Sequence, residues 1–312
     1  MINFRFILSR FLQALVTLLA MSFFVYVLIG LMPGDPVDLM MAGNPRMTPE
    51  DALRLRALYG LDRPLLERYA RWALSVLSGD IGYSRLYGLP VQDVLAPRLL
   101  NTVYLTGLAL VLTVLVAVPL GVHAAQNPQS KTDRAIGIFC LSGLSVPAFW
   151  LALLLISLFA VKLGWLPASA ARENPLSLVL PVLVLTLGGL AAYTRHMRSA
   201  MVDALKENHI KTAFAKGCSP SRVVWRHAFK NALPPVVTIL MLDLGAIFGG
   251  AVTIETVFAY PGMGKLMFDA VMGNDFNLAL AGFLLLTAFV LLGNFLADVV
   301  YAFLDPRIGR TA

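Results

Sequence analysis

The feature that most constrains this chain is its set of long apolar runs. A helix needs about 20 consecutive apolar residues to cross the hydrocarbon core of a bilayer. Of the 312 residues, 58% are hydrophobic and only 14% are charged, which excludes an ordinary soluble domain. The sequence therefore predicts an all-α integral membrane protein with six transmembrane helices. We place these spans at residues 6–32, 102–125, 136–161, 176–193, 233–257 and 278–304.

The first span and the segment after it form two predicted domains. The first run is too long for a cleavable signal and lacks a small-residue cleavage site, so we expect a retained helix within residues 1–32. Residues 33–36, Pro-Gly-Asp-Pro, cannot continue it. Residues 33–100 hold eight basic and eight acidic residues, and their periodic apolar positions predict two small helices. We interpret this segment as a helical insert that forms a solvated cap, and residues 101–312 as a core domain with five spans.

Basic residues in the loops predict the orientation, because short cytoplasmic loops are enriched in Lys and Arg. On one side lie two basic residues near the N-terminus, two in the 126–134 loop, eight in residues 195–230 and two near the C-terminus. The short loops on the other side hold only three basic residues. We therefore expect both termini and residues 195–230 to be cytoplasmic and the insert to be external.

Residues 195–230, between the fourth and fifth spans, form a segment that we call the basic module. It carries eight basic residues against two acidic ones, and its first half has helical periodicity. A second short helix is predicted over 210–216, since Gly217 supplies the left-handed conformation that commonly ends a helix. Ser219 is a candidate cap for the next helix, with Pro220 at its first position. The pattern indicates a helix–Gly–helix unit outside the hydrocarbon, suited to being gripped by a partner.

The basic module resembles the cytoplasmic EAA coupling loop of ABC importer permeases, above all that of the dipeptide, oligopeptide and nickel branch. The Glu-Ala-Ala pattern is not literal, because Lys and Thr stand where Glu and Ala would be. The resemblance implies that the loop docks into a cleft of an ATP-binding subunit. The matching residues are Lys211, Thr212, Ala213, Phe214, Ala215, Lys216 and Gly217, followed by residues 226–234, Arg-His-Ala-Phe-Lys-Asn-Ala-Leu-Pro.

Five further segments resemble that branch and occur in the same order along the chain. They are residues 31–36 (LMPGDP), 79–84 (GDIGYS), 164–167 (GWLP), 255–264 (ETVFAYPGMG) and 298–307 (DVVYAFLDPR). The resemblance implies a subunit that forms half of a pore for peptides or related small solutes in a bacterial inner membrane. It also implies a homologous second permease, two ATP-binding subunits, an extracytoplasmic solute-binding protein and surrounding lipid as partners. It implies no nucleic acid.

No residue pattern in this chain predicts an enzyme, a metal site or a bound cofactor. A Walker A loop needs Gly-Lys followed by Ser or Thr, and the single Gly-Lys pair is followed by Leu266. Catalytic residues and metal ligands are therefore both expected to be none. We expect ATP and Mg²⁺ only in the partner subunits. The four histidines, His123, His196, His209 and His227, are scattered along the chain.

Two carboxylates inside predicted spans are candidate functional residues, because a charge in hydrocarbon is costly. Asp243 lies near the middle of the fifth span. It either lines the translocation path or forms a hydrogen-bonded tie between helices, and the sequence leaves both readings open. Asp298 lies nearer the cytoplasmic end of the sixth span, where we expect a structural tie.

Several alternatives to a peptide importer remain at this stage. The same kind of complex could import nickel or a metal chelate, and the solute is not set by these residues. The basic module could bind only anionic lipid, although lipid attraction would not require its apolar residues. An ion-driven secondary transporter would favour inverted repeats, yet the insert after the first span has no counterpart after the fourth. An intramembrane enzyme would need a catalytic constellation.

Overall fold

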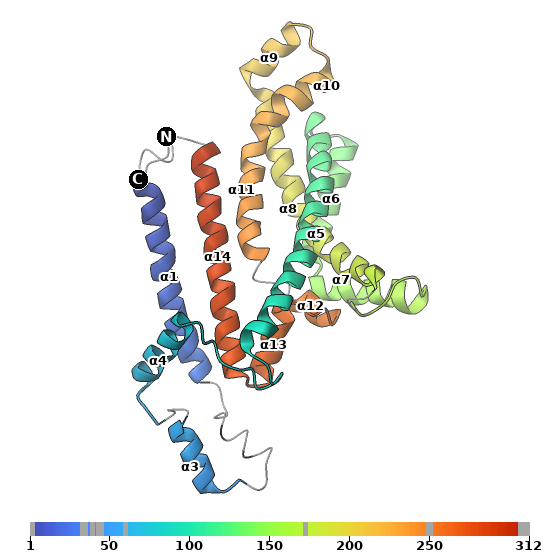
Figure 1. Cartoon of the computed structure of the whole chain (residues 1–312). Helices are drawn as coiled ribbons and strands as arrows, with labels where there is room; N and C mark the ends of the chain where they lie inside the picture. Colours follow the sequence, from blue (N-terminus) through green and yellow to red (C-terminus); the bar gives the residue numbers. More distant parts are fainter. Residues whose placement is uncertain are drawn as a thin grey trace.

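The computed structural model describes residues 4–31, 37, 41, 47–58, 62–170, 174–247 and 252–304. Over these ranges the regular structure is helical, with no strand and one isolated antiparallel bridge between Tyr83 and Pro90. Figure 1 shows long helices running alongside one another, with short helices gathered at both ends. The predicted all-α class is therefore confirmed.

Four helices in the described ranges are long and apolar enough to cross a membrane. Helices α1 and α14 match the first and sixth predicted spans closely, whereas α5 and α8 extend well beyond the second and fourth. The extensions carry charged residues, such as Asp93 and Arg98 in α5 and Arg195 and Arg198 in α8, so apolar length alone did not predict them. These helices are α1 (Phe4–Gly30), α5 (Val91–Gln126), α8 (Val179–Lys206) and α14 (Phe276–Leu304).

The third predicted span is not one continuous helix, so that prediction is corrected. Residues 136–161 divide between α6 (Lys131–Ser145) and α7 (Ala148–Leu155), which continues as a π-helix over Ile156–Lys162. The two parts are bent by 97°. The break falls at Val146, whose backbone is extended, because the proline that follows disfavours the helical conformation before it.

The fifth predicted span, residues 233–257, is described in two parts. Helix α11 (Phe229–Ile247) covers its first part, and α12 (Val252–Val257) covers its end. Residues 248–251 lie outside the described residues. Helix α13 (Met263–Met272) follows α12 and packs against the start of α14.

The short helices divide between the two ends of the long ones. The two small helices predicted in the insert are confirmed as α3 (Pro49–Leu58) and α4 (Leu65–Leu77). They lie at one end, whereas α9 (Asn208–Ala215) and α10 (Pro220–Arg222) lie at the opposite end. Helix α1 begins at that opposite end, and α14 ends there. The first and last helices and the basic module therefore share one end of the molecule.

Among the described helices, α5 and α8 share the most extensive contact. A Cβ added at Gly121 of α5 would lie 2.7 Å from the Cβ of Met197 and 2.8 Å from the carbonyl oxygen of Thr194. Small residues allow this approach, and membrane helices associate largely through such packing. Tyr193, Met197 and Met201 of α8 are almost fully buried in the cluster that results. The Gly121 contact therefore sets the position of the half of α8 that leads toward α9.

We predict that Gly121→Ala destabilises the fold, because the added methyl group has no space between α5 and α8. Overpacking of this kind costs about 1–3 kcal/mol. The measurement is the melting temperature and folded yield of the detergent-solubilised chain. Gly107→Ala, on the same helix with nothing within 4 Å of the added Cβ, is the matched control and should not lower either quantity. Equal behaviour of the two variants would contradict the packing account.

Candidate functional site

The basic module is held by two helices that continue out of the long-helix bundle. Helix α8 runs without a break to Lys206, beyond the predicted end of the fourth span at residue 193. On the other side, α10 passes into a π-helix (Val223–Ala228) and then into α11, so helical backbone continues from Pro220 to Ile247. Helix α9 lies between these two supports at the end of the molecule (Figure 1). Helix α9 is therefore joined by short non-helical links, Glu207 on one side and residues 216–219 on the other, to helical backbone that leads into the bundle.

Helix α9 is fixed on its inner face and exposed on its outer face. Ile210 and Ala213 are 1% and 6% exposed and pack in the cluster that contains Val223 and Ala228. Phe214 is 49% exposed and lies in the sequence between the exposed residues Lys211 and Lys216. Among the seven residues matched to the coupling loop, Ala213 alone is buried. The six exposed members are Lys211, Thr212, Phe214, Ala215, Lys216 and Gly217.

Gly217 ends α9 in the left-handed conformation that the sequence predicts, with φ of +77°. Its amide donates to the carbonyl of Phe214 at 2.9 Å, and the amide of Cys218 donates to the carbonyl of Ala213 at 3.2 Å. These bonds satisfy carbonyls that the end of a helix leaves free. Ser219 and Pro220 stand at the predicted cap and first positions of α10, but the Ser219 side chain makes no capping hydrogen bond. Here the proline and the backbone alone start the helix.

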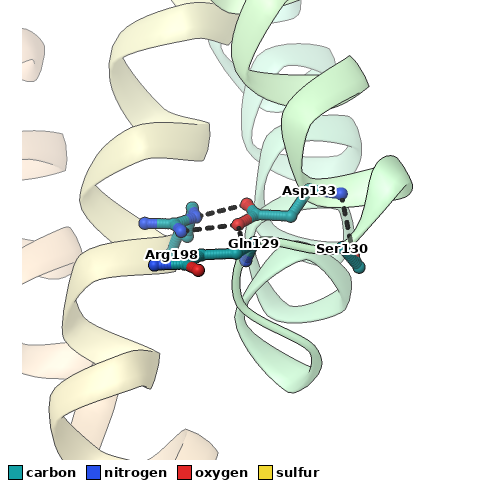
Figure 2. A network of polar contacts seen from close by, with 4 residues as sticks. All are labelled: Gln129, Ser130, Asp133 and Arg198. Atoms are coloured by element: carbon teal, nitrogen blue, oxygen red, sulfur yellow. Dashed lines mark hydrogen bonds and ion pairs between the residues drawn. The ribbon is translucent and has the colours of Figure 1, made fainter.

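An ion pair of Arg198, which lies in the first part of the basic module, joins α8 to the start of α6. Figure 2 shows Arg198 of α8 facing Asp133 of α6. Arg198 donates from Nε to Asp133 Oδ1 at 2.5 Å and from Nη2 to Oδ2 at 2.7 Å. The amide of Gln129 also donates to Asp133 Oδ2, at 2.8 Å, and Ser130 Oγ accepts from the amide of Asp133 at 3.2 Å. A bidentate pair of this kind fixes orientation as well as distance.

Sequence reasoning counted Arg198 only as one of eight basic charges and did not single out Asp133. The available signal was the Ser-x-x-Asp spacing of Ser130 and Asp133, which marks a helix start. That signal places the carboxylate in the first turn of α6, but it does not name the arginine 65 positions later. The pairing depends on how α6 and α8 pack.

Asp243 of α11 has a partner on α8. The hydroxyl of Tyr193 donates to Asp243 Oδ2 at 2.7 Å. Tyr193 is 2% exposed, and Asp243 is half-buried. The contact is what a tie between helices requires, and it joins the two helices that support the basic module. Whether Asp243 also lines a path for solute stays a prediction.

Asp298 is likewise paired, as expected for a structural tie. Its Oδ2 lies 3.3 Å from Nε of Arg10, which joins α14 to α1 near the end that also carries the basic module. Both side chains are more than a third exposed, so the pair contributes less to stability than a buried one would.

The GDIGYS segment, residues 79–84, is anchored by a buried aspartate that the sequence analysis missed. Ser84 Oγ donates to Asp275 Oδ2 at 2.5 Å, and the amide of Leu86 donates to the same oxygen at 3.0 Å. The other oxygen of Asp275 accepts from the amide of Leu278 at 3.2 Å, and so caps α14. Ser84 and Asp275 are 2% and 1% exposed. The insert is thereby locked to the start of the last long helix.

The ETVFAYPGMG segment, residues 255–264, folds around the fully buried carboxylate of Glu255. Thr102 Oγ1 donates to Glu255 Oε1 at 2.7 Å, and the amide of Lys265 donates to Oε2 at 2.9 Å. A Cβ at Gly262 would overlap the carboxylate, so only glycine fits there. Glu255 therefore joins α12, α5 and the first turn of α13, which explains why this motif combines a glutamate with glycines.

Potential metal ligands are not clustered in the part of the chain that the structure describes. Over those ranges, no group of three or more His, Cys, Asp or Glu residues is placed to hold a metal ion. His209, on α9, instead contacts Asn231 of α11 through its Nε2 atom at 2.8 Å. The polar contacts described above join helices to one another around the exposed helix α9.

Comparisons with known proteins agree with this class of membrane transport subunit. Residues 117–310 match the family model of the binding-protein-dependent transport system inner membrane component, and residues 3–106 match the N-terminal model for the membrane component of such systems. The oligopeptide transport system permease protein AppB of Bacillus subtilis (strain 168) is 35% identical over 313 residues, covering 97% of this chain and 98% of AppB.

A second relative is named "Probable peptide ABC transporter permease protein y4tP" and comes from Sinorhizobium fredii (strain NBRC 101917 / NGR234). It is 35% identical over 310 residues, with 97% of this chain and 98% of that protein covered. A solved structure of the MetNI methionine ABC transporter, in an inward-facing conformation, matches with a TM-score of 0.58 at 20% identity. That match covers 69% of this chain and 98% of the MetNI chain, and it shows likeness of fold.

These matches cover the chain nearly from end to end and define its class, a permease subunit of an ABC importer. The chain belongs to the family of binding-protein-dependent transport system inner membrane components. It is accordingly a multi-pass protein of the inner membrane, and its family is one of transport proteins. The resemblance inferred from the six sequence segments is confirmed.

We predict that Asp243 acts as a tie to Tyr193. Asp243→Asn keeps an oxygen that can accept from the Tyr193 hydroxyl, so the recovery of intact protein after detergent extraction should match that of the wild type. Asp243→Leu leaves the buried hydroxyl without an acceptor, which costs about 1–3 kcal/mol, and recovery should fall. Uptake of charged and neutral solutes is measured in parallel. Selective loss of cation uptake in Asp243→Asn would place Asp243 in the solute path instead.

Proposed function

We propose that this chain forms half of the translocation pore of a peptide importer and couples that pore to ATP hydrolysis through α9. Six spans would surround the path, with the bent pair α6–α7 as the third and α11 with α12 contributing the fifth. The observation that carries the proposal is the position of α9, which is exposed at the end of two continuous helices. In such an arrangement, movement of a bound partner shifts α8 and α11 together.

The residues exposed on α9 favour binding to a protein partner rather than to a lipid surface. Lys211 and Lys216 place positive charge on either side of Phe214. Anionic lipid would attract the lysines but would not need an aromatic side chain exposed among them. A cleft that has an apolar floor and acidic edges fits both features. We propose that two ATP-binding subunits provide such clefts, one for this chain and one for a homologous second permease, and that ATP and Mg²⁺ bind in those subunits.

The orientation proposed here places the basic module and both termini in the cytoplasm. The excess of Lys and Arg in the loops at that end supports it. The insert, with α3 and α4, would then face the extracytoplasmic solute-binding protein.

We expect opposite labelling of cysteines at the two ends in a chain that carries Cys140→Ala and Cys218→Ser. Gln92→Cys, at an exposed site at the start of α5, should react with an impermeant thiol reagent in intact cells. Ser221→Cys, at an exposed site in α10, should react only after permeabilisation. The measurement is the labelled fraction before and after opening the membrane, and the reverse pattern would overturn the orientation.

Gly217 offers a sharp test of coupling, because the space around it is open and only its backbone conformation is restrictive. Gly217→Val should uncouple the complex, since a β-branched residue at positive φ costs about 1–2 kcal/mol or more. Stimulation of ATPase activity by the loaded solute-binding protein should drop while the level of assembled complex holds. Gly217→Asn is the matched control, because asparagine tolerates this conformation, and it should keep most of the stimulation. Normal stimulation in Gly217→Val would contradict the proposal.

The solute class rests on the relatives. AppB belongs to an oligopeptide transport system and y4tP is named as a peptide transporter permease, so we propose peptides as the solutes. Uptake of a labelled peptide should be competed by unlabelled peptides and not by nickel salts. Competition by nickel alone would replace the peptide assignment with a metal importer.

A further inference from the structure

Helix α4 of the insert packs against α1 within its apolar stretch rather than beyond its end. Tyr69 of α4 packs edge-on against Phe23 and Tyr26 of α1, with ring centroids 5.1 and 5.5 Å apart. The Tyr69 hydroxyl also lies 2.7 Å from the hydroxyl oxygen of Ser22. These α1 residues precede Gly30, where the apolar stretch Ile7–Gly30 ends. At 1.5 Å per residue, they lie about 6–12 Å inside that end of the helix.

The face of α4 that turns away from α1 is apolar and exposed. Leu66, Leu74 and Leu77 are 68%, 66% and 83% exposed, and helical spacing places them within about 80° of one another. The charged residues occupy the adjoining face, where Glu67 Oε1 accepts from Arg63 Nη1 at 2.7 Å and lies 3.1 Å from Arg71 Nη2. Helix α4 therefore has one face on α1, one exposed apolar face and, next to the apolar face, a charged one.

We propose that α4 is an interfacial helix, with its exposed leucine face inserted among lipid acyl chains at that surface of the bilayer. Amphipathic helices that lie in the plane of the interface combine an apolar face with a polar face rich in Arg or Lys. Aromatic side chains such as Tyr69 and Trp72 are enriched at the same depth in membrane proteins. This proposal differs, for α4, from the sequence expectation of a solvated cap.

Lipid fits this face better than a protein partner does, because of where α1 lies. Only 11% of the most apolar stretch of α1 is buried within the chain, so α1 stands at the edge of the bundle. Phe24 and Leu28 of α1 are 53% and 49% exposed near the same depth as the α4 contact. A membrane-spanning helix with such a surface is covered by acyl chains, and α4 lies against it. Figure 1 shows α4 beside the end of α1 and away from α8 and α9. The proposal does not depend on which solute is carried.

The test uses the full chain alone in phosphatidylcholine vesicles, with Cys140→Ala and Cys218→Ser and one added cysteine labelled with bimane. Leu77→Cys and Leu66→Cys report on the apolar face, and Arg71→Cys on the charged face, where the side chain is 62% exposed. Labels on the apolar face should emit at shorter wavelength and lose intensity when the vesicles contain phosphatidylcholine with a nitroxide high on its acyl chain. The Arg71→Cys label should instead be quenched by aqueous iodide.

Two outcomes would overturn the proposal. Equal quenching of all three labels by iodide, without quenching by the nitroxide lipid, would show that α4 is solvated. Protection of the apolar face that appears only in the assembled complex, and not in the chain alone, would show that a partner protein covers it. Because all three positions are exposed in the fold, the labels should leave folding intact, and elution of each variant as a single species on gel filtration checks this.

Discussion

The close approach of α5 and α8 at Gly121 is the constraint on which the rest of the arrangement depends. A Cβ there would meet the side chain of Met197 and also come within 3.0 Å of the amide of Arg198. The same contact that buries Met197 therefore brings Arg198 beside the loop after α5, where it reaches Asp133. Packing and the ion pair act at one level of α8, and both hold the helix rigid where it leaves the bundle toward α9.

Buried carboxylates form several of the joints between described segments that are distant in sequence. Asp133, Glu255 and Asp275 are nearly or fully buried, and each accepts hydrogen bonds both from a backbone amide and from a side chain of another element. A buried charge without such partners would be costly, so these sites admit few conformations. The joints lie at the two ends of the long helices, where they can fix the insert and the basic module while the helices between them move as units.

The sequence predicted best those features that depend on the residues of one helix alone. Apolar length predicted α1 and α14, and the Gly217 pattern predicted both the end of α9 and its positive φ. The sequence predicted least well where one helix ends and the next begins, and which residues of distant elements contact each other. Val146 breaks the third run because of the proline that follows, a local signal that apolar length masked. The partners of Asp133, Glu255 and Asp275 lie 65, 153 and 191 positions away, and only the packed fold brings them together. The roles of α9 and Asp243 still rest on sequence and geometry.

We propose that the exposed face of α9 contacts an ATP-binding subunit, and a photo-crosslinking amino acid at single positions of α9 and α10 in the assembled complex would detect that contact. A probe at Phe214, which is 49% exposed, should capture an ATP-binding subunit, whereas a probe at Ser221 of α10, also exposed, should capture less. The yield at Phe214 should change between nucleotide-free and ATP-bound states. Capture of lipid alone at Phe214, with no ATP-binding subunit in either state, would contradict it.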